Sequence, residues 1–317
     1  MAVTLEAAKQ NSADDIELAI IDEFAKSPLL EYIPFDDAVN PAGGGATLTY
    51  GYRRETQTGT AAFRAINSEY VPEERPATTT HAVELTPLGG AFEIDRVLAK
   101  IGPVATNEVT RQLNGKIEGA RAKFADALIN GDSSAEANAF DGLSKLLTGT
   151  TTHVGDELGF ADRSEDGAFA LMDALDEFLA LMSGEPTVII ANKKTIARIK
   201  SAGRRASVYT EKPGPLGHMR AFYGNAALVD PGQKPGTNTD IIPVTDGVTS
   251  LYAARFSLDD VHGVSLAGQN LINYWLPDFS TAGAVKRGEV EMGPVAIAVK
   301  RTKSAAMASN IRIAPSA

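Results

Sequence analysis

The chain has 317 residues, of which 44% are hydrophobic and 22% are charged, and its formal net charge is −10 at pH 7. It contains no cysteine, which excludes disulfide bonds, thiolate catalysis and cysteine metal sites. We expect a soluble protein without a signal peptide or a membrane-spanning segment, and the acidic balance argues against nucleic-acid binding as its main activity, because phosphate binding depends on Lys and Arg.

The first predicted elements are a short helix and an extended segment. Ile16, Ile20 and Phe24 share one face of an amphipathic helix predicted over residues 14–24, and Pro28 ends it. Residues 29–35 are mostly apolar and lie between prolines, which favours an extended anchor rather than a helix. A simple docking segment is the alternative interpretation.

Residues 41–100 predict a two-stranded ribbon with a long excursion at its tip. Strand-like alternation covers residues 47–53 and 78–85, and after a break at Gly89-Gly90 it resumes over residues 91–95. A two-stranded ribbon cannot bury the large apolar side chains of its own excursion, which are Phe63, Ile66 and Tyr70. We therefore expect a neighbouring copy of the chain to cover them, although a flap over the chain's own core is an alternative.

A long amphipathic helix is predicted over residues 104–129. Apolar side chains recur there in steps of four and three, at Val109, Leu113, Ile117, Ala120, Phe124 and Leu128. At ~1.5 Å per residue the helix would be roughly 39 Å long, well above the ordinary length of a globular helix.

The second half of the chain predicts a mixed α/β layer. A helix over residues 167–183 precedes a buried strand over 187–191, and Asn192 is suited to cap a helix over 193–201. Residues 202–217 are basic and rich in glycine and proline, which predicts a surface loop. Further strands are predicted over residues 226–229, 249–255, 285–290, 295–299 and 309–313.

No catalytic, cofactor-binding or metal site is predicted. The four histidines, His81, His153, His218 and His262, lie far apart in the sequence and form no ligand motif. No Gly-x-Ser-x-Gly motif is present, and Asp259-Asp260 is an isolated acidic pair.

The order of these elements resembles that of the major capsid proteins of tailed bacteriophages, whose fold was first seen in phage Hong Kong 97. Residues 16–35 resemble the N-terminal arm of that family, residues 63–69 lie within its extended loop, and residues 104–129 match its spine helix. Shorter phrases recur in the same order as turns around the axial and peripheral domains: Phe140–Leu143, Ile190–Thr195, Phe222–Ala226 and Val261–Ser265.

The resemblance implies an α+β fold with five segments. These are an N-terminal arm (1–40), an extended loop with peripheral-domain strands (41–100), a peripheral domain with the spine helix (101–150), an axial domain (151–280) and return strands of the peripheral domain (281–317).

The resemblance also implies a function. The chain would be a coat protein, without enzymatic activity or cofactor, that self-assembles into an icosahedral shell of hexamers and pentamers. The shell would enclose double-stranded DNA without sequence-specific binding, in a virion assembled in the host bacterial cytoplasm, with scaffolding, portal and decoration proteins as partners. An encapsulin-like nanocompartment shell and a soluble α/β hydrolytic enzyme remain as alternatives.

One departure from the type member concerns covalent cross-linking. In that protein a lysine of the extended loop forms an isopeptide bond to an asparagine of a neighbour. This chain has no lysine between Lys26 and Lys100. We therefore expect its shell to be held by non-covalent contacts or by a separate cementing protein.

The extended loop supplies the candidate inter-subunit contacts. We expect Phe63, Ile66 and Tyr70 to pack on a neighbour. Charged residues of the ribbon would form ion pairs between subunits: Arg53, Arg54, Arg64, Glu69, Glu73, Glu74 and Arg75. Because an exposed ion pair contributes only ~0–1 kcal/mol, the apolar contacts would dominate.

Overall fold

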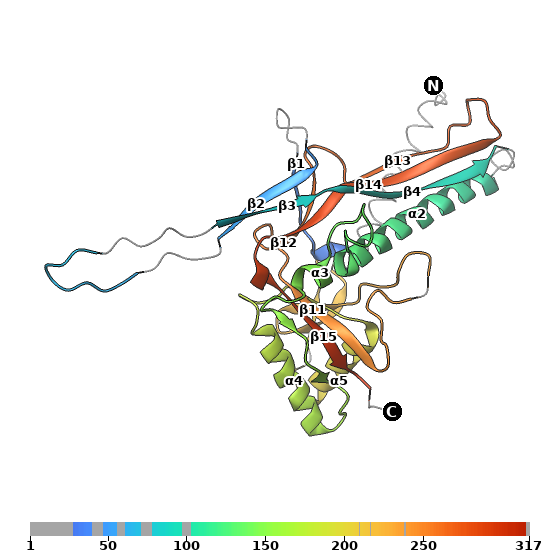
Figure 1. Ribbon diagram of the computed structural model, residues 1–317. Coiled ribbons are helices and arrows are strands. Elements are labelled where there is room, and N and C mark those ends of the chain that lie inside the picture. The colour runs from blue at the N-terminus through green and yellow to red at the C-terminus, as the bar shows by residue number, and fades with distance from the viewer. Residues whose placement is uncertain are drawn as a thin grey trace.

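The computed structural model describes residues 28–39, 47–55, 61–70, 78–96, 103–208, 210–215, 217–237 and 239–314, with side chains of the long helix described from residue 109 onward. It shows a body built on two β-sheets, with a long ribbon that projects away from it (Figure 1). The helix predicted over residues 14–24 lies outside the described residues.

The first sheet carries the long helix on one face. Its strand order is β1 (Phe35–Val39), β12 (Val261–Leu266), β14 (Val285–Val299) and β13 (Ile272–Trp275), and β4 (Thr86–Asp95) also pairs with β14. Helix α2 (Pro103–Asn130) packs along β4 and β14, as Figure 1 shows. The predicted spine helix is therefore confirmed, and Leu113, Ile117, Phe124 and Leu128 of its apolar face are fully buried.

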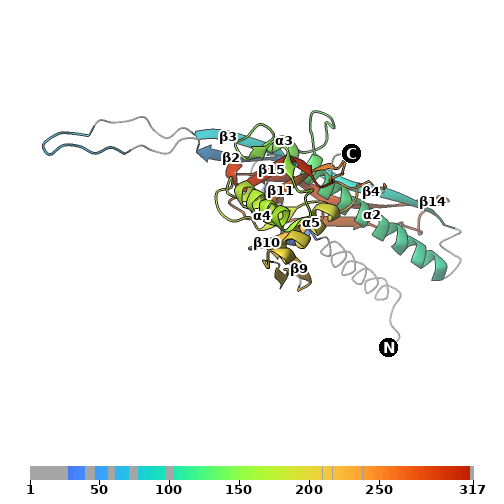
Figure 2. The ribbon, with the colours of Figure 1, turned by 90° about the horizontal axis from the view of Figure 1, so that it is seen from below.

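The second sheet holds most of the remaining strands. Its order is β5 (His153–Val154), β15 (Ala305–Arg312), β11 (Val248–Ala254), β7 (Val188–Ile190), β10 (Ala226–Val229), β9 (Met219–Tyr223) and β8 (Thr210–Pro213), with β6 (Leu158–Gly159) also beside β15. Helices α4 (Glu165–Leu179) and α5 (Lys193–Arg205) lie together on one face (Figure 2). Short helical pieces complete the chain: η1 (Leu30–Tyr32), α3 (Leu143–Leu147) and η3 (Thr302–Ser304).

The two sheets share one of the two hydrophobic cores. Val188, Ile190 and Tyr252 of the second sheet belong to the same buried cluster as Phe124 of α2 and Val264 of the first sheet. The opposite face of the second sheet forms a separate core with α4 and α5. The cluster around α2 therefore connects the sheet that carries the ribbon to the rest of the body.

Two predicted interruptions in strands are wrong. Strand β4 runs through Gly89-Gly90 without a break, and residues 285–299 form one long strand, β14. A Cβ atom on Gly89 would lie 2.1 Å from the carbonyl oxygen of Val290, so glycine is needed there for close pairing of the strands. The irregularity around Gly293-Pro294 appears only as a shift of register between Met292 and Val295.

Other boundaries also need correction. Helix α4 ends at Leu179 rather than at residue 183, and the loop predicted over residues 202–217 contains the end of α5 and strand β8. The phrase Val261–Ser265, expected as a turn, is part of the buried strand β12. Gly263 fits there because the ring of Phe35 lies where its side chain would be.

The last segment divides between the two sheets. We expected residues 281–317 to return to the peripheral sheet, and β14 does so. Strand β15 instead pairs with β11 in the second sheet. The chain thus crosses from one sheet to the other within residues 300–304.

The predicted cap of α5 is confirmed. The side-chain oxygen of Asn192 accepts a hydrogen bond from the backbone N–H of Thr195 at 2.9 Å, and its amide nitrogen donates to the Thr249 hydroxyl at 2.6 Å. Because Asn192 is buried, both groups would lose a partner if it were removed.

We expect Asn192→Ala to lower the free energy of unfolding by about 1–2 kcal/mol, the usual cost of losing a buried cap. Urea denaturation followed by circular dichroism would measure the change. Asn138→Ala is the control, since Asn138 is exposed. Equal stabilities for the two variants would contradict this account of the cap.

Candidate assembly interface

A two-stranded ribbon stands apart from both sheets. Strands β2 (Thr49–Glu55) and β3 (Thr78–Glu84) pair antiparallel over seven consecutive residue pairs, from Thr49↔Glu84 to Glu55↔Thr78. Beyond these strands the chain extends far from the body, as both ribbon views show (Figures 1 and 2). The predicted ribbon is therefore confirmed, and its tip has no contact with the chain's own core.

The tip is a turn held by its own hydrogen bonds. The Ser68 N–H and hydroxyl both donate to the Ala65 carbonyl, and the Arg64 guanidinium donates to the carbonyls of Ala65 and Ser68 at 3.3 and 3.1 Å. Asn67 adopts a positive φ of 66°, which asparagine tolerates better than most residues. The guanidinium also lies 5.4 Å from the centre of the Tyr70 ring.

The apolar side chains of the tip face solvent. Phe63 and Ile66 are essentially fully exposed, and Tyr70 is 65% exposed. Covering a side chain of this size gains about 1.5–3 kcal/mol, so leaving three of them uncovered forgoes a large stabilisation. An exposed apolar cluster of this kind is typical of a binding surface.

The root of the ribbon, by contrast, is fastened to the body. Tyr50, Tyr52 and Arg54 of β2 point toward the first sheet, while Arg53 and Glu55 face solvent. The Tyr52 hydroxyl donates to the Val299 carbonyl at 2.9 Å, and the Arg54 guanidinium donates to the carbonyls of Val299 and Lys300 at 2.7 and 3.0 Å. These bonds fix the direction in which the ribbon leaves the body.

Burial at the root shifts two titrating groups. Burial raises the pKa of Tyr52, although the neighbouring Arg54 opposes the shift. The ring of His81 stacks on Tyr52 at 5.6 Å, and desolvation with the Arg54 charge lowers the pKa of His81. Both residues are therefore neutral at pH 7, which suits an aromatic stack beside a guanidinium.

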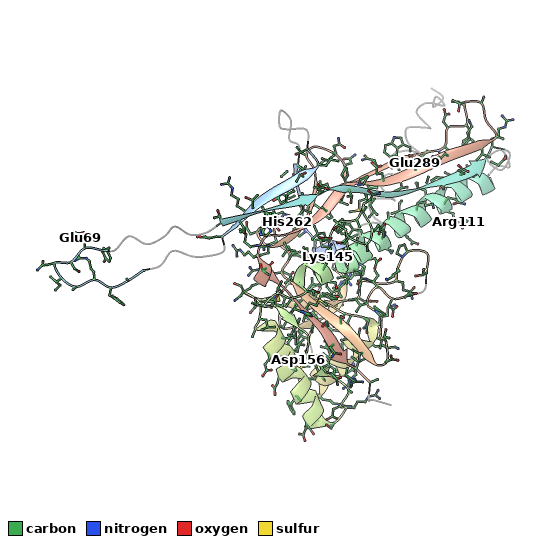
Figure 3. All side chains as sticks on the ribbon, viewed as in Figure 1. Glu69, Arg111, Lys145, Asp156, His262 and Glu289 are labelled. Carbon is green, nitrogen blue, oxygen red and sulfur yellow. The ribbon has the colours of Figure 1, made fainter. Side chains whose placement is uncertain are left out.

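The structure places the candidate contact residues in three settings. Phe63, Arg64, Ile66, Glu69 and Tyr70 gather at the tip, where Figure 3 labels Glu69. Arg53 is exposed on the ribbon, and Arg54 binds carbonyls of its own chain. Glu73, Glu74 and Arg75 lie outside the described residues.

A second exposed apolar surface was not foreseen from the sequence. Trp275, Leu276, Phe279 and Val285 are all at least 36% exposed and surround the start of β14 and the end of β13. This is the end of the first sheet opposite the ribbon, where Figure 3 labels Glu289. Sequence periodicity could not reveal it, because exposed and buried apolar residues have the same composition.

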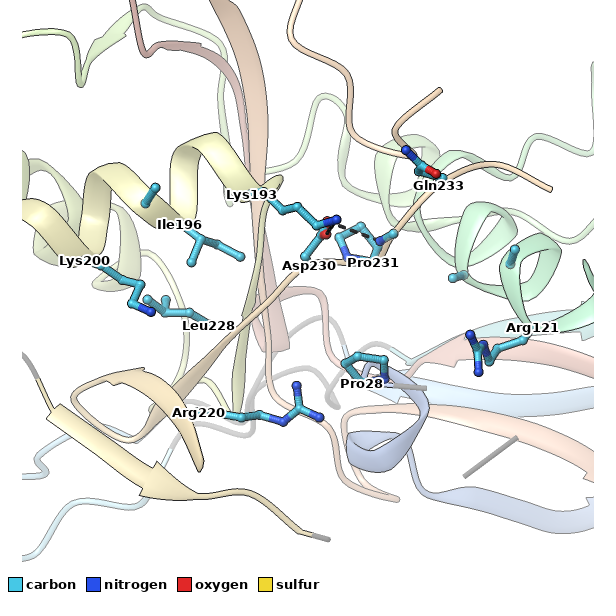
Figure 4. A pocket seen from close by; sticks show the side chains of 14 residues that line it. Pro28, Arg121, Lys193, Ile196, Lys200, Arg220, Leu228, Asp230, Pro231 and Gln233 are labelled. Carbon is cyan, nitrogen blue, oxygen red and sulfur yellow. Dashed lines mark hydrogen bonds and ion pairs between the residues drawn. The ribbon is translucent and has the colours of Figure 1, made fainter. Parts of the chain in front are cut away.

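A basic cleft lies between the long helix and the second sheet (Figure 4). Its volume is about 640 Å³, and its charged lining comprises Arg121, Lys193, Lys200, Arg220 and Asp230. Lys193 lies 3.8 Å from Asp230, and burial raises the pKa of that carboxyl. Arg220 is held by both carboxylate oxygens of Glu31 at 2.9 Å.

The one serine–histidine contact among the described residues is not arranged for catalysis. His153 Nε2 lies 2.9 Å from the Ser309 hydroxyl, while its Nδ1 accepts a hydrogen bond from the Gly149 N–H at 3.3 Å. A neutral ring with an accepting Nδ1 carries its proton on Nε2, so it donates to the serine instead of removing a proton from it. This arrangement does not support the hydrolase alternative.

The remaining tests for chemistry also concern the described part of the chain. Within it, no group of three or more His, Asp or Glu side chains is placed to hold a metal ion. No described helix combines the length and the hydrophobicity needed to cross a membrane.

Comparison with known proteins shows similarity of structure without similarity of sequence. No family model matches the chain, and no curated protein matches its sequence. Among solved structures, the SrpI encapsulin of Synechococcus elongatus is similar with a TM-score of 0.59 and 14% identity, covering 92% of this chain and 90% of that one. A structure from Mycobacterium phage Bobi gives 0.59 and 12%, with 89% and 90% covered.

A third similar structure, the capsid of the Myoviridae phage XM1, has a TM-score of 0.57 and 11% identity over 89% of this chain and 91% of that one. These matches cover both sheets and the long helix together, not one motif. The chain therefore has the α+β fold of the Hong Kong 97-like capsid proteins.

Proposed function

We propose that the chain is the major capsid protein of a tailed bacteriophage, which self-assembles into an icosahedral shell of hexamers and pentamers around double-stranded DNA. The observation that carries the proposal is the ribbon tip, where Phe63, Ile66 and Tyr70 are exposed beyond the reach of their own core. On a Hong Kong 97-like fold, a second copy of the chain is the partner that would cover them.

The geometry suits a heterologous interface. The ribbon leaves one end of the first sheet and the exposed patch around Trp275 lies at the other, so the two surfaces of a single chain cannot meet. Contacts between different surfaces of identical subunits close into rings when the rotation permits. Hexamers and pentamers are such rings, and the charged ribbon residues would form ion pairs within them.

The proposal assigns the shell to a virion capsid assembled in the host bacterial cytoplasm. Scaffolding, portal and decoration proteins would be its partners, and the enclosed DNA would be bound without sequence specificity. The net charge of −10 is consistent with a coat that does not grip the DNA it contains. No catalytic role is proposed.

An encapsulin-like nanocompartment is the second candidate, because the SrpI encapsulin is as similar in structure as the phage proteins. Both candidates require shell formation, and they differ in what the shell encloses. A nanocompartment would carry a cargo protein.

Electron microscopy and size-exclusion chromatography of the chain expressed alone would test the proposal. We expect closed shells, rings of five or six subunits, or tubes. Shells that co-purify with a specific protein would favour the nanocompartment. A uniform monomer that also stays unassembled with the proteins encoded beside it would overturn both candidates.

A further inference from the structure

His262 occupies an unusual position beneath the root of the ribbon. It lies on β12, its side chain has no exposed surface, and neither ring nitrogen has a hydrogen-bond partner. Its ring meets the ring of Tyr50 edge to face, with centres 5.8 Å apart and planes at 84°. Figure 3 shows the residue where the ribbon joins the body.

The register of the strands defines what shares this face of the sheet. Asp36 of β1 pairs with Val264, and His262 pairs with Ala298 of β14, so Asp36, His262 and Ala298 lie on one face. Gly263 and its partner Phe35 lie on the other face, where Phe35 contacts Phe124 of α2. His262 therefore faces the ribbon and not the long helix.

Tyr50 connects the ribbon to this face through a single hydrogen bond. Its hydroxyl donates to the Asp36 carboxylate at 3.1 Å, and the Lys300 ammonium lies 5.7 Å from the centre of its ring. The charged and titrating groups around His262 come from every packed element: Asp36, Tyr50, Tyr52, Arg54, His81, Asp259, Asp260 and Lys300.

The docked arrangement suits only a neutral ring. Desolvation and then the Lys300 charge lower the pKa of His262, while Asp36, the Asp260 carbonyl and Asp259 oppose the shift. A protonated imidazole has two N–H donors, and here both would be buried without an acceptor in hydrogen-bonding geometry. Its natural partner, Asp36, is already occupied by Tyr50.

We propose that His262 is a pH-sensitive latch for the ribbon: the neutral ring allows β2 and β3 to dock on the first sheet, and the protonated ring releases them. Release moves Tyr50 away, admits water and frees Asp36 to pair with the imidazolium. The latch governs the aim of the ribbon, so its importance for assembly rests on the proposed shell function.

The direction of the effect follows from proton linkage. The docked state has the lower histidine pKa and so binds fewer protons than the released state. Docking is therefore fully stable above the ordinary histidine pKa of about 6.5 and weakens as the pH falls below it, by up to about tenfold per pH unit for one proton. This window lies above the pH at which carboxylates such as Asp260, whose pKa is lowered, take up protons.

Hydrogen–deuterium exchange on the full-length, unassembled chain tests the latch. Protection factors of β2 and β3 are expected to fall by roughly tenfold between pH 6.5 and 5.5, while those of β11 and β15 stay constant. His262→Gln should abolish the fall, because glutamine does not titrate. His218→Gln is the matched control on an exposed histidine and should keep it.

Three results would overturn the proposal: constant protection of β2 and β3 in the wild type, an unchanged fall in His262→Gln, or an equal loss in β11 and β15. If the glutamine variant fails to fold, NMR titration of the wild-type histidines replaces it. The β2 and β3 amides must then follow the His262 titration and no other. Because the subunit is measured before assembly, failure of the latch is distinct from failure to form shells.

Discussion

Replacing Phe63, Ile66 and Tyr70 together by serine is expected to abolish shell formation and to leave the subunit folded. All three side chains are exposed in the subunit, so their removal costs little in stability. Each would contribute about 1.5–3 kcal/mol when covered by a neighbour, so the triple variant loses roughly 4–9 kcal/mol at every contact. At 1.4 kcal/mol per tenfold, that weakens each contact by at least ~10³.

Electron microscopy with light scattering would measure assembly, and urea denaturation would verify the fold. The matched control replaces three exposed apolar residues of the body, Leu146, Phe169 and Val208, by serine. It removes the same number of apolar side chains and should still assemble. Assembly of the tip variant, or equal loss in both variants, would contradict the proposed role of the tip.

Charge reversal at the tip should have a smaller effect. Arg64 is exposed and already bonded to carbonyls of its own turn. Arg64→Glu is therefore expected to change assembly by the ~0–1 kcal/mol typical of an exposed ion pair, and the change should shrink at high salt. The contrast with the triple variant would separate apolar packing from charge.

The sequence predicted the elements whose pattern is set by local contacts. The apolar stripe of residues 104–129 could be satisfied only by a long helix with one buried face, and α2 is that helix. Asn192 was recognisable as a cap because its side chain bonds the backbone three residues later. The ribbon was recognisable because its two strands are close in sequence and alternate in polarity.

The errors lie where the reason for a residue is distant in sequence. Gly89 reads as a strand break, but its absent side chain makes room for the backbone of Val290, about 200 residues away. Gly263 likewise makes room for Phe35. Single-sequence patterns carry no information on such contacts.

The candidate interface was only half foreseen. The tip was predicted because Phe63, Ile66 and Tyr70 exceed what a ribbon can bury. The root was missed, since the contacts of Tyr52 and Arg54 with Val299 and Lys300 join segments about 250 residues apart. His262 looked like an isolated histidine for the same reason, and only the packing of β2 on β12 reveals its position.

Phe124→Ala is expected to cause the largest loss of stability, about 3–5 kcal/mol, as is usual for a buried phenylalanine that leaves a cavity. Phe124 has no exposed surface, and its ring lies 5.8 Å from Phe35 and 5.9 Å from Phe140. It therefore joins α2 to the start of β1 and to the segment before α3. The buried cluster that contains it also includes residues of both sheets.

Urea denaturation would measure the loss as a lower midpoint, with Phe169→Ala as the control. Phe169 is also a helical phenylalanine, but it is about half exposed on α4, so its loss should cost less than ~1 kcal/mol. Equal costs would mean that the shared core does not bear on stability as described. A large cost with loss of protection in both sheets would show that α2 makes them a single cooperative unit, the rigid base from which the ribbon is aimed.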